Sequence, residues 1–218
     1  IIPARSGSKG IKNKNIRLVK KKPLLSYSIK YAKKCKFVDN IIVSTDSLKY
    51  ANIAKKYKAD VPFLRPKKLS GDKVQDYPVI KDCLNKSEKY YKNKFDYIVL
   101  LRPTSPFREK QLIEKGLNKI NKIKFSSSIR SVIQTKSHPY RHWRINKEGK
   151  LNSIILKIKE PYNIPRQQLP KIFFQTGDLE IIKRRTIING SISGNYVIPL
   201  LVKTYKDIDE IEDLKTIT

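Results

Sequence analysis

The sequence is poor in the residues that build disulfide frameworks and structural metal sites. Only two cysteines, Cys35 and Cys83, and two histidines, His138 and His142, occur in 218 residues. The cysteines lie far apart without a C-x-x-C spacing, which argues against zinc and disulfides and favours buried, inert thiols. The histidines are four residues apart, but Pro139 opposes the helix that would align them as ligands. We therefore predict neither a zinc site nor a disulfide scaffold.

Long apolar segments are also missing. No run of eighteen apolar residues occurs, and the opening lacks the charged, apolar and small-residue order of a secretion signal. We therefore expect a cytoplasmic protein with no membrane partner. The chain has no methionine and begins on the end of an apparent strand, so we expect that a few residues completing this strand are missing from the sequence.

Acidic residues are scarce. The 19 Asp and Glu stand against 48 Lys and Arg, a formal net charge of +29, which raises nucleic-acid binding as an alternative function. The lysines are nonetheless scattered through nearly every segment, as at 20–22, 33–34 and 55–56, and do not interleave with aromatics as in an RNA-binding motif. This distribution favours a solvated basic surface that attracts anionic substrates.

The chain is long enough to bury a full core, because 39% of its residues are hydrophobic. We predict a single domain over residues 1–218. Alternation of helical and strand-like segments predicts an α/β fold, a mostly parallel sheet covered by helices. The helical segments are at about 24–35, 48–57 and 77–90, and the strand-like runs are at 41–45, 61–64 and 97–101.

The first sixteen residues carry the clearest functional signal. An apolar strand end runs into a small cationic loop in which Gly7 and Gly10 allow successive N–H groups to converge on an anion, while Arg5, Lys9 and Lys14 supply charge. The loop is neither a Walker loop nor a Gly-x-Gly-x-x-Gly motif. We predict that it holds the phosphates of a nucleoside triphosphate.

Two further polar strings follow predicted strands. Ser-Thr-Asp at 44–46 ends one strand, and Arg-Pro-Thr-Ser-Pro at 102–106 ends another. Because parallel sheets bind ligands beyond the carboxyl ends of their strands, these strings and the cationic loop are expected to meet at one edge.

The second half of the chain has a different texture. After a strand-like piece at 128–133, a loop-rich segment from 138 to 170 predicts an inserted β-rich excursion that serves as a lid or dimer surface. The final stretch returns to the core through 197–200 and an acidic segment, 207–213.

Asp207 and Asp209 flank Ile208, so in an extended segment both carboxylates lie on one side. Mg²⁺ binds one or two carboxylates together with substrate phosphates, so the pair suits a triphosphate enzyme. The alternative is an acidic start of a helix, which stabilises the helix dipole, and the two roles are compatible.

Several strings resemble, in family order and over essentially the whole chain, the motifs of the cytidylyltransferases that activate sialic acid and related nonulosonic acids as CMP-sugars. They are Pro-Ala-Arg-x-x-Ser-Lys-Gly with Lys-Asn, Ser-Thr-Asp, Leu-Arg-Pro before an acidic residue, Pro-Thr-Ser-Pro-x-Arg, Arg-Gln-Gln-Leu-Pro and Asp-Ile-Asp-x-x-x-Asp, at residues 3–15, 44–46, 64–72, 103–108, 166–170 and 207–213.

The resemblance implies a Rossmann-like nucleotidyltransferase that forms a homodimer through a small β-rich insertion at about 133–168. It implies an Mg²⁺-dependent attack of a 2-keto sugar acid on the α-phosphorus of CTP, giving a CMP-sugar and pyrophosphate. A metal-bound water near Asp207 and Asp209 is our candidate for the base.

The residues assigned by resemblance are Arg5, Ser8, Lys9, Lys14 and Asn15 for the phosphates, Ala4 and Arg65 for the nucleoside, Thr104 and Ser105 for both ligands, Arg141 and Arg166 for the sugar carboxylate, Asp207 and Asp209 for the metal, and Arg5, Lys14, Asp207 and Asp209 for catalysis.

Three positions depart from the sialic-acid pattern. Arg102 replaces a glutamine, and Thr176 and Glu180 replace an asparagine and a tyrosine expected to contact the sugar. We therefore predict a different nonulosonic-type 2-keto sugar acid, with Arg102, Thr176 and Glu180 in the sugar site. The alternatives are the eight-carbon acid Kdo or another sugar and nucleotide on the same fold, and, in a different class, a basic nucleic-acid-binding protein on that fold.

Overall fold

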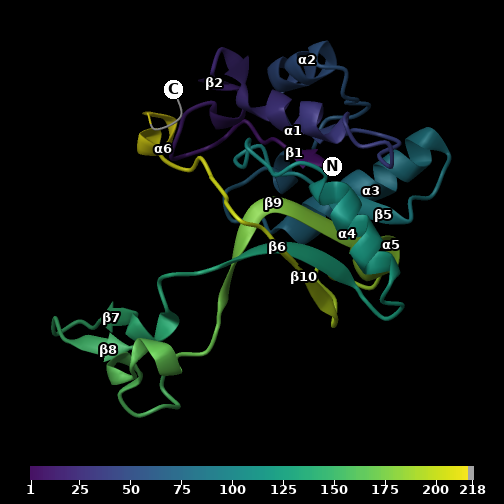
Figure 1. Cartoon of the computed structure of the whole chain (residues 1–218). Helices are drawn as coiled ribbons and strands as arrows, with labels where there is room; N and C mark the ends of the chain where they lie inside the picture. Colours follow the sequence, from purple (N-terminus) through teal and green to yellow (C-terminus); the bar gives the residue numbers. More distant parts are fainter. Residues whose placement is uncertain (216–218) are drawn as a thin grey trace.

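The computed structural model describes residues 1–215, which form an α/β fold with a projecting arm (Figure 1). The strands of the main sheet, in spatial order, are β4 (Val43–Ser44), β1 (Ile2–Pro3), β5 (Tyr97–Leu100), β9 (Phe173–Lys183), β6 (Ser128–Gln134) and β10 (Val197–Leu201). The helices are α1 (Leu24–Ala32), α2 (Leu48–Lys56), α3 (Asp76–Tyr91), α4 (Leu112–Asn121), α5 (Arg184–Ile188) and α6 (Ile211–Lys215).

The backbone of Ile1 joins the two halves of this sheet. Its nitrogen donates to the carbonyl of Val99 at 2.7 Å, and the amide of Leu101 donates to the carbonyl of Ile1 at 3.1 Å. This places β1 between β4 and β5. The pairs β1–β4 and β6–β10 are parallel, and only β9 runs antiparallel to its neighbours in the described sheet. The prediction of a mostly parallel sheet is confirmed.

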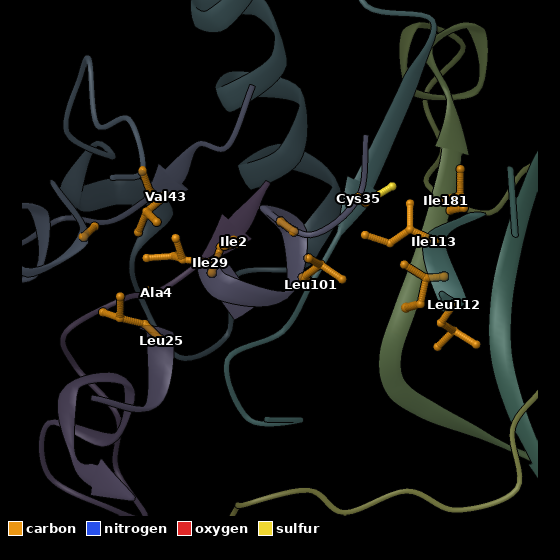
Figure 2. Packing of buried hydrophobic residues seen from close by; sticks show 14 of the residues in the cluster. Ile2, Ala4, Leu25, Ile29, Cys35, Val43, Leu101, Leu112, Ile113 and Ile181 are labelled. Atoms are coloured by element: carbon orange, nitrogen blue, oxygen red, sulfur yellow. The ribbon is translucent and has the colours of Figure 1, made fainter. Parts of the chain in front are cut away.

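Helices cover both faces of the sheet, as the side chains of β9 show. Neighbouring side chains of a strand point to opposite faces, and Ile181 and Ile182 accordingly belong to different apolar clusters. Ile181 belongs to the same cluster as residues of α1 and α4, and Figure 2 shows it beside Ile113 and Leu112 of α4. Ile182 packs with residues of α3 and α5, including Leu84 and Ile187. The fold is therefore a three-layer α/β arrangement.

The predicted elements lie close to the observed ones, with one exception. The predicted strand at 61–64 is wrong, because pairing there stops at a single parallel bridge between Ile42 and Asp60. Pro62 has no N–H to donate to a ladder, and Pro66 follows closely. The sequence analysis also missed α4 and β9. In β9 the polar residues at 175–178 conceal the strand pattern.

Residues 135–172 form the arm, which leaves the sheet at the end of β6 and returns at the start of β9 (Figure 1). It carries an antiparallel hairpin and three single 3-10 turns, so the prediction of an inserted β-rich excursion matches its position and content. Its elements are η3 (Pro139–Arg141), β7 (Trp143–Ile145), β8 (Leu151–Ser153), η4 (Pro161–Asn163) and η5 (Arg166–Gln168).

Smaller elements complete the described chain. They are η1 (Lys14–Ile16), η2 (Lys67–Leu69) and a hairpin of β2 (Leu18–Val19) and β3 (Lys22–Pro23). Between residues 1 and 215, none of the helices has both the length and the apolar character that crossing a bilayer requires.

Gly194 provides a stability test. Its φ is +68°, and an added Cβ would lie 2.3 Å from the Cβ of Ser127, at the start of β6. We expect Gly194→Ala to lower the free energy of unfolding by about 2–4 kcal/mol, from the left-handed backbone and the overlap together. The measurement is urea denaturation. Gly149→Ala is the control, since Gly149 has φ +79° but open space around it. Equal losses in the two variants would contradict the steric argument.

Candidate active site

A cavity of about 390 Å³ opens where β1 and β5 end at their carboxyl sides. The predicted strings do meet there, because residues of the cationic loop, of the segment after β5 and of the 65–79 segment share its wall. The lining residues are Pro3, Arg5, Ser8, Lys9, Gly10, Lys14, Asn15, Arg65, Leu69, Gly71, Asp72, Val74, Asp76, Val79, Arg102, Pro103 and Thr104.

Residues 44–46 form hydrogen bonds with two segments of the cavity wall, at Ser6 and at Arg65. Asp46 accepts hydrogen bonds from the amide and the hydroxyl of Ser6, each at 2.8 Å, which fixes the start of the cationic loop. Ser44 accepts from Nε of Arg65 through its hydroxyl at 3.0 Å and from Nη2 through its carbonyl at 2.7 Å. Burial lowers the pKa of Arg65, because it disfavours the charged guanidinium. The hydrogen bonds to Ser44 and the negative charge of the nearby Asp46 oppose this effect and stabilise the charged form.

Two of the three cations of the loop, Arg5 and Lys9, are paired with one acid. Asp72 lies 2.5 Å from Nη1 of Arg5 and 2.8 Å from Nζ of Lys9. Hydrogen bonds from Lys9 and Arg5 hold the pKa of Asp72 below its usual value. The loop is also tied internally, since Nδ2 of Asn15 donates to the carbonyl of Arg5 at 2.9 Å. Asp72 therefore occupies cations that a triphosphate would need.

The two aspartates near the carboxyl end flank a buried isoleucine and have separate polar partners. Ile208 is fully buried and donates its amide to the carbonyl of Thr104 at 2.9 Å. On either side of it, Asp207 accepts a hydrogen bond from the hydroxyl of Ser105, and Asp209 lies 2.8 Å from Nζ of Lys14. The acidic segment is thereby docked between the ends of β1 and β5.

Gly177 in β9 permits this docking. An added Cβ would lie 2.6 Å from Oγ of Ser105 and 3.1 and 3.2 Å from the two carboxylate oxygens of Asp207. The register between β6 and β9 shifts between Arg130 and Val132, so β9 is irregular at this point. The absence of a side chain here is therefore a requirement of the Ser105–Asp207 contact.

Arg108 is a buried cation behind the cavity wall. Its Nε donates to the carbonyl of Asp178 and its Nη2 to the carbonyl of Arg102, both at 2.5 Å. Burial lowers the pKa of Arg108 to about 10, which leaves it charged at neutral pH. Asp178 is 2% exposed, and burial raises the pKa of its carboxyl.

A second group of charges lies where β5, β6 and β9 meet. Glu180 is 1% exposed and pairs with Arg102 at 2.8 Å and with Arg130. Arg102 also lies 2.6 Å from Asp76, the first residue of α3. Burial alone would lower the pKa of Arg102, but the hydrogen bonds and charges of Asp76 and Glu180 outweigh it and raise the pKa. Of this group, Asp76 and Arg102 line the cavity.

The structure brings most of the predicted site residues together. Ser105 and Asp207 adjoin the lining, and Ala4 lies fully buried beneath the loop. Thr176 and Glu180 are buried within β9, where the hydroxyl of Thr176 donates to that of Ser131. The predicted residues that line the cavity are Arg5, Ser8, Lys9, Lys14, Asn15, Arg65, Arg102 and Thr104.

Arg141 and Arg166 are not brought to the cavity within this chain. Both belong to the arm, on η3 and η5, and neither is among the lining residues. The sequence analysis, in turn, assigned no role to Asp76, Arg130 or Gly177. No local motif could have found Arg130, because its partner Glu180 is brought opposite it only by the pairing of β6 and β9.

The first 155 residues match the family model described as "Cytidylyltransferase". The chain belongs to the cytidylyltransferase family. This confirms the resemblance and the expected class of enzyme. A CMP-N,N'-diacetyllegionaminic acid synthase of Campylobacter jejuni is 32% identical over 99% of this chain and 91% of its own length. A protein of the same name from Legionella pneumophila is 32% identical over 97% and 89%.

Solved structures support the fold. A CMP:2-keto-3-deoxy-manno-octonic acid synthetase complexed with CTP superposes with a TM-score of 0.72 at 13% identity, over 99% of this chain and 94% of that one. The 4-diphosphocytidyl-2C-methyl-D-erythritol synthase of Anaerococcus prevotii gives a TM-score of 0.61 at 12% identity, over 99% and 94%. At these identities the likeness concerns the fold alone, and it confirms the nucleotidyltransferase architecture.

Gly177→Ala tests the docking of the acidic segment in this cytidylyltransferase. The new methyl group would separate Ser105 from Asp207, and a shift of about 1 Å at a reacting centre costs on the order of 10- to 100-fold in rate. We expect that loss in CTP turnover with little change in the thermal midpoint. Gly149→Ala is the control, since Gly149 is not among the lining residues and its Cβ would meet nothing within 4 Å. Full activity of Gly177→Ala would contradict the docking role.

Asp72→Asn tests the competition for the loop cations. Removing the carboxylate frees Arg5 and Lys9, so we expect the KM for CTP to fall severalfold. Because the pKa of Asp72 is lowered, its carboxylate stays ionised as the pH falls toward its ordinary value of 3.8. The difference between variant and wild type should therefore persist from about pH 8 to pH 5. An increase in the KM for CTP would instead assign Asp72 a role in binding.

Proposed function

We propose that this cytidylyltransferase activates a nonulosonic-type 2-keto sugar acid. The sugar's anomeric hydroxyl gives its proton to a base near Asp207 and Asp209, and its oxygen bonds to the α-phosphorus of CTP. The bond from that phosphorus to the bridging oxygen breaks, and pyrophosphate leaves with a CMP-sugar formed. The observation that carries the proposal is the cavity lined by the cationic loop, whose lining residue Lys14 pairs with Asp209 of the acidic segment beside it. The names of the relatives that match nearly the whole chain support the class of sugar.

The cavity has cations in its wall that suit the triphosphate. Arg5, Lys9 and Lys14 approach it from one loop, and the amides around Ser8 and Gly10 belong to the same wall. Phosphoryl-type transfer needs little covalent help from the protein, so orientation and stabilisation of charge dominate. In this proposal Arg5 and Lys14 neutralise the charge that develops on the phosphates, while Arg65 and the backbone at Ala4 lie near the nucleoside.

The residues present fit a magnesium ion. Asp207 and Asp209 offer carboxylates from one segment, and among residues 1–215 these carboxylates contact a hydroxyl, that of Ser105, and an ammonium group, that of Lys14, which a ligand could replace. Two carboxylates suffice when the substrate supplies phosphate oxygens, since Mg²⁺ keeps several waters. When bound, the ion would neutralise phosphate charge and orient the α-phosphate.

The arm is the proposed dimer surface. Its hairpin and loops expose large apolar side chains, among them Ile145, Leu151 and Leu156, and isolated copies rarely leave such side chains uncovered in a group. Arg141 and Arg166 lie on the same arm, so a second copy would bring them to a sugar site that one chain leaves without them.

The function is tested by pyrophosphate release from CTP, ATP, GTP or UTP with Mg²⁺ and a panel of 2-keto sugar acids that includes Kdo. We expect release with CTP and one nonulosonic acid. Release with Kdo would contradict the proposed class of sugar. Release with ATP, GTP or UTP would contradict the assignment of CTP as the nucleotide substrate. Silence across the panel combined with salt-sensitive RNA binding would favour the nucleic-acid alternative.

Asp207→Asn and Asp209→Asn test the metal pair. Each change removes one negative charge while keeping the shape, so we expect turnover to fall by about 100-fold or more. Chelation by EDTA should abolish turnover, and added Mg²⁺ should restore it. Asp82→Asn is the control, because Asp82 pairs with Lys86 along α3 away from the cavity. Wild-type rates in both site variants would exclude the pair as metal ligands.

A further inference from the structure

One residue of β6 faces four residues of β9. A shift of register in this ladder leaves Ser131 alone opposite residues 176–179, which we call the bulge. The pairs on either side of the shift are Arg130–Glu180 and Val132–Gln175. A ladder interrupted in this way loses regular backbone hydrogen bonds in the interior of a sheet, so the polar groups at the two ends of the bulge need other partners.

The hydroxyl of Ser131 provides these partners. Its oxygen accepts a hydrogen bond from the hydroxyl of Thr176 at 2.8 Å and from the amide of Leu179 at 3.0 Å. Its proton is donated to the carbonyl of Leu179 at 3.0 Å, which is nearer than the carbonyl of Thr176 at 3.4 Å. A hydroxyl has one proton and two lone pairs, so the capacity of Ser131 is fully used. Because Thr176 and Leu179 are the first and last residues of the bulge, one oxygen atom ties its two ends together.

The ends of the bulge are also shielded from water. Ser131 and Leu179 are fully buried, and Thr176 is 1% exposed. Water cannot replace the partner of a donor or acceptor that is buried so deeply. Loss of the Ser131 hydroxyl would leave the amide of Leu179 and the hydroxyl of Thr176 unpaired, so we expect the bulge to change shape in order to satisfy them.

The two residues between these ends reach the active site. Gly177 leaves no room for a side chain, since an added Cβ would lie 2.6 Å from Oγ of Ser105 and 3.1 Å from a carboxylate oxygen of Asp207. Asp178 accepts a hydrogen bond through its carbonyl from Nε of Arg108 at 2.5 Å. A change in the shape of the bulge would therefore move backbone that is in contact with the Ser105–Asp207 pair.

Arg108 connects the bulge to two other elements. Its Nη2 donates to the carbonyl of Arg102, which follows β5, at 2.5 Å, and its Nη1 donates to the hydroxyl of Ser28 in α1 at 3.1 Å. The bulge is thus held by β6 at its two ends and, through Arg108, by α1 and the segment after β5. Since the regular ladder is interrupted here, these side-chain hydrogen bonds decide where Gly177 lies.

We propose that Ser131 is a positioning residue for the transfer reaction. By tying the ends of the bulge, its hydroxyl places Gly177 against Ser105 and thereby orients the carboxylate of Asp207. Ser131 is not among the residues that line the cavity, and we assign it no contact with CTP or the sugar acid. The inference rests on the proposed function, because Ser131 acts through the part that Asp207 plays there.

The first test compares two fully buried serines. Steady-state pyrophosphate release is measured for wild type, Ser131→Ala and Ser126→Ala, with each substrate varied in turn. Ser126→Ala is the matched control, because the hydroxyl of Ser126 donates to the carbonyl of Ile123 at 2.6 Å, after α4 and outside the cavity lining. We expect Ser131→Ala to lower kcat by about 10-fold or more with nearly unchanged KM values, as for a displaced group at a reacting centre. Equal losses of kcat in the two variants would overturn the inference.

The partner of Ser131 offers a second pair of variants. Thr176→Val removes the donor but keeps the shape of the side chain, and Thr176→Ser keeps the donor. We expect Thr176→Val to lower kcat severalfold, Thr176→Ser to retain it, and Thr176→Val to add little to Ser131→Ala, because both act through one hydrogen bond. The Thr176 variants remain informative if Ser131→Ala fails to fold. A higher KM for the sugar acid with kcat unchanged in Thr176→Val would make Thr176 a sugar contact and overturn the inference.

Crystal structures of the variants give a readout that does not depend on turnover. We expect the Ser105–Asp207 hydrogen bond to be broken in Ser131→Ala and Thr176→Val and retained in Ser126→Ala. A retained hydrogen bond in Ser131→Ala, or a wild-type kcat for this variant, would overturn the inference and leave the proposed function in place. A wild-type enzyme silent with every sugar acid would overturn the proposed function itself, and the crystal structures would still decide whether Ser131 positions Asp207.

Discussion

Repulsion between cations is the constraint around which this active site is organised. With 48 basic and 19 acidic side chains, carboxylates are the scarce component of the chain, and several of them stand at the cavity. Asp72 pairs with Arg5 and Lys9, and Asp209 pairs with Lys14. Without these acids the loop would place its positive charges together with nothing to oppose them. An anionic substrate that binds these cations would take the place of the carboxylates of Asp72 and Asp209.

The reversed strand β9 connects this charged edge to the core. Its apolar residues Ile181 and Ile182 pack on opposite faces of the sheet, and Asp178 and Glu180, just before them in the strand, are buried acids. Gly177 then gives room for Ser105 to reach Asp207. One strand thus packs in the core on both faces of the sheet, leaves room for the acidic segment at Gly177 and contacts Arg102 through Glu180.

Some residues of the site could be predicted from local sequence motifs, and others could not. The cationic loop, the 44–46 string and the Asp207–Asp209 pair were predictable, because each is a local pattern at a strand end and parallel strands bring such ends to one edge. Thr176 and Glu180 were placed in the sugar site by position in a motif. The structure instead buries both in β9, where Thr176 bonds to Ser131 and Glu180 to two arginines. Their assigned roles depended on which face of the sheet their side chains occupy, and a sequence motif does not specify this.

The sequence by itself determined the α/β class, the cationic loop and the family, since these depend on periodicity and on residues close together in the chain. It predicted the place of the arm and the acidic pair for the same reason. Only the tertiary structure decided that Asp72 occupies the loop cations, that Gly177 admits Ser105 to Asp207, and that Glu180 holds Arg102 from behind. Those contacts join residues far apart in the chain, and their energies depend on burial and direction, which exist only once the strands are paired.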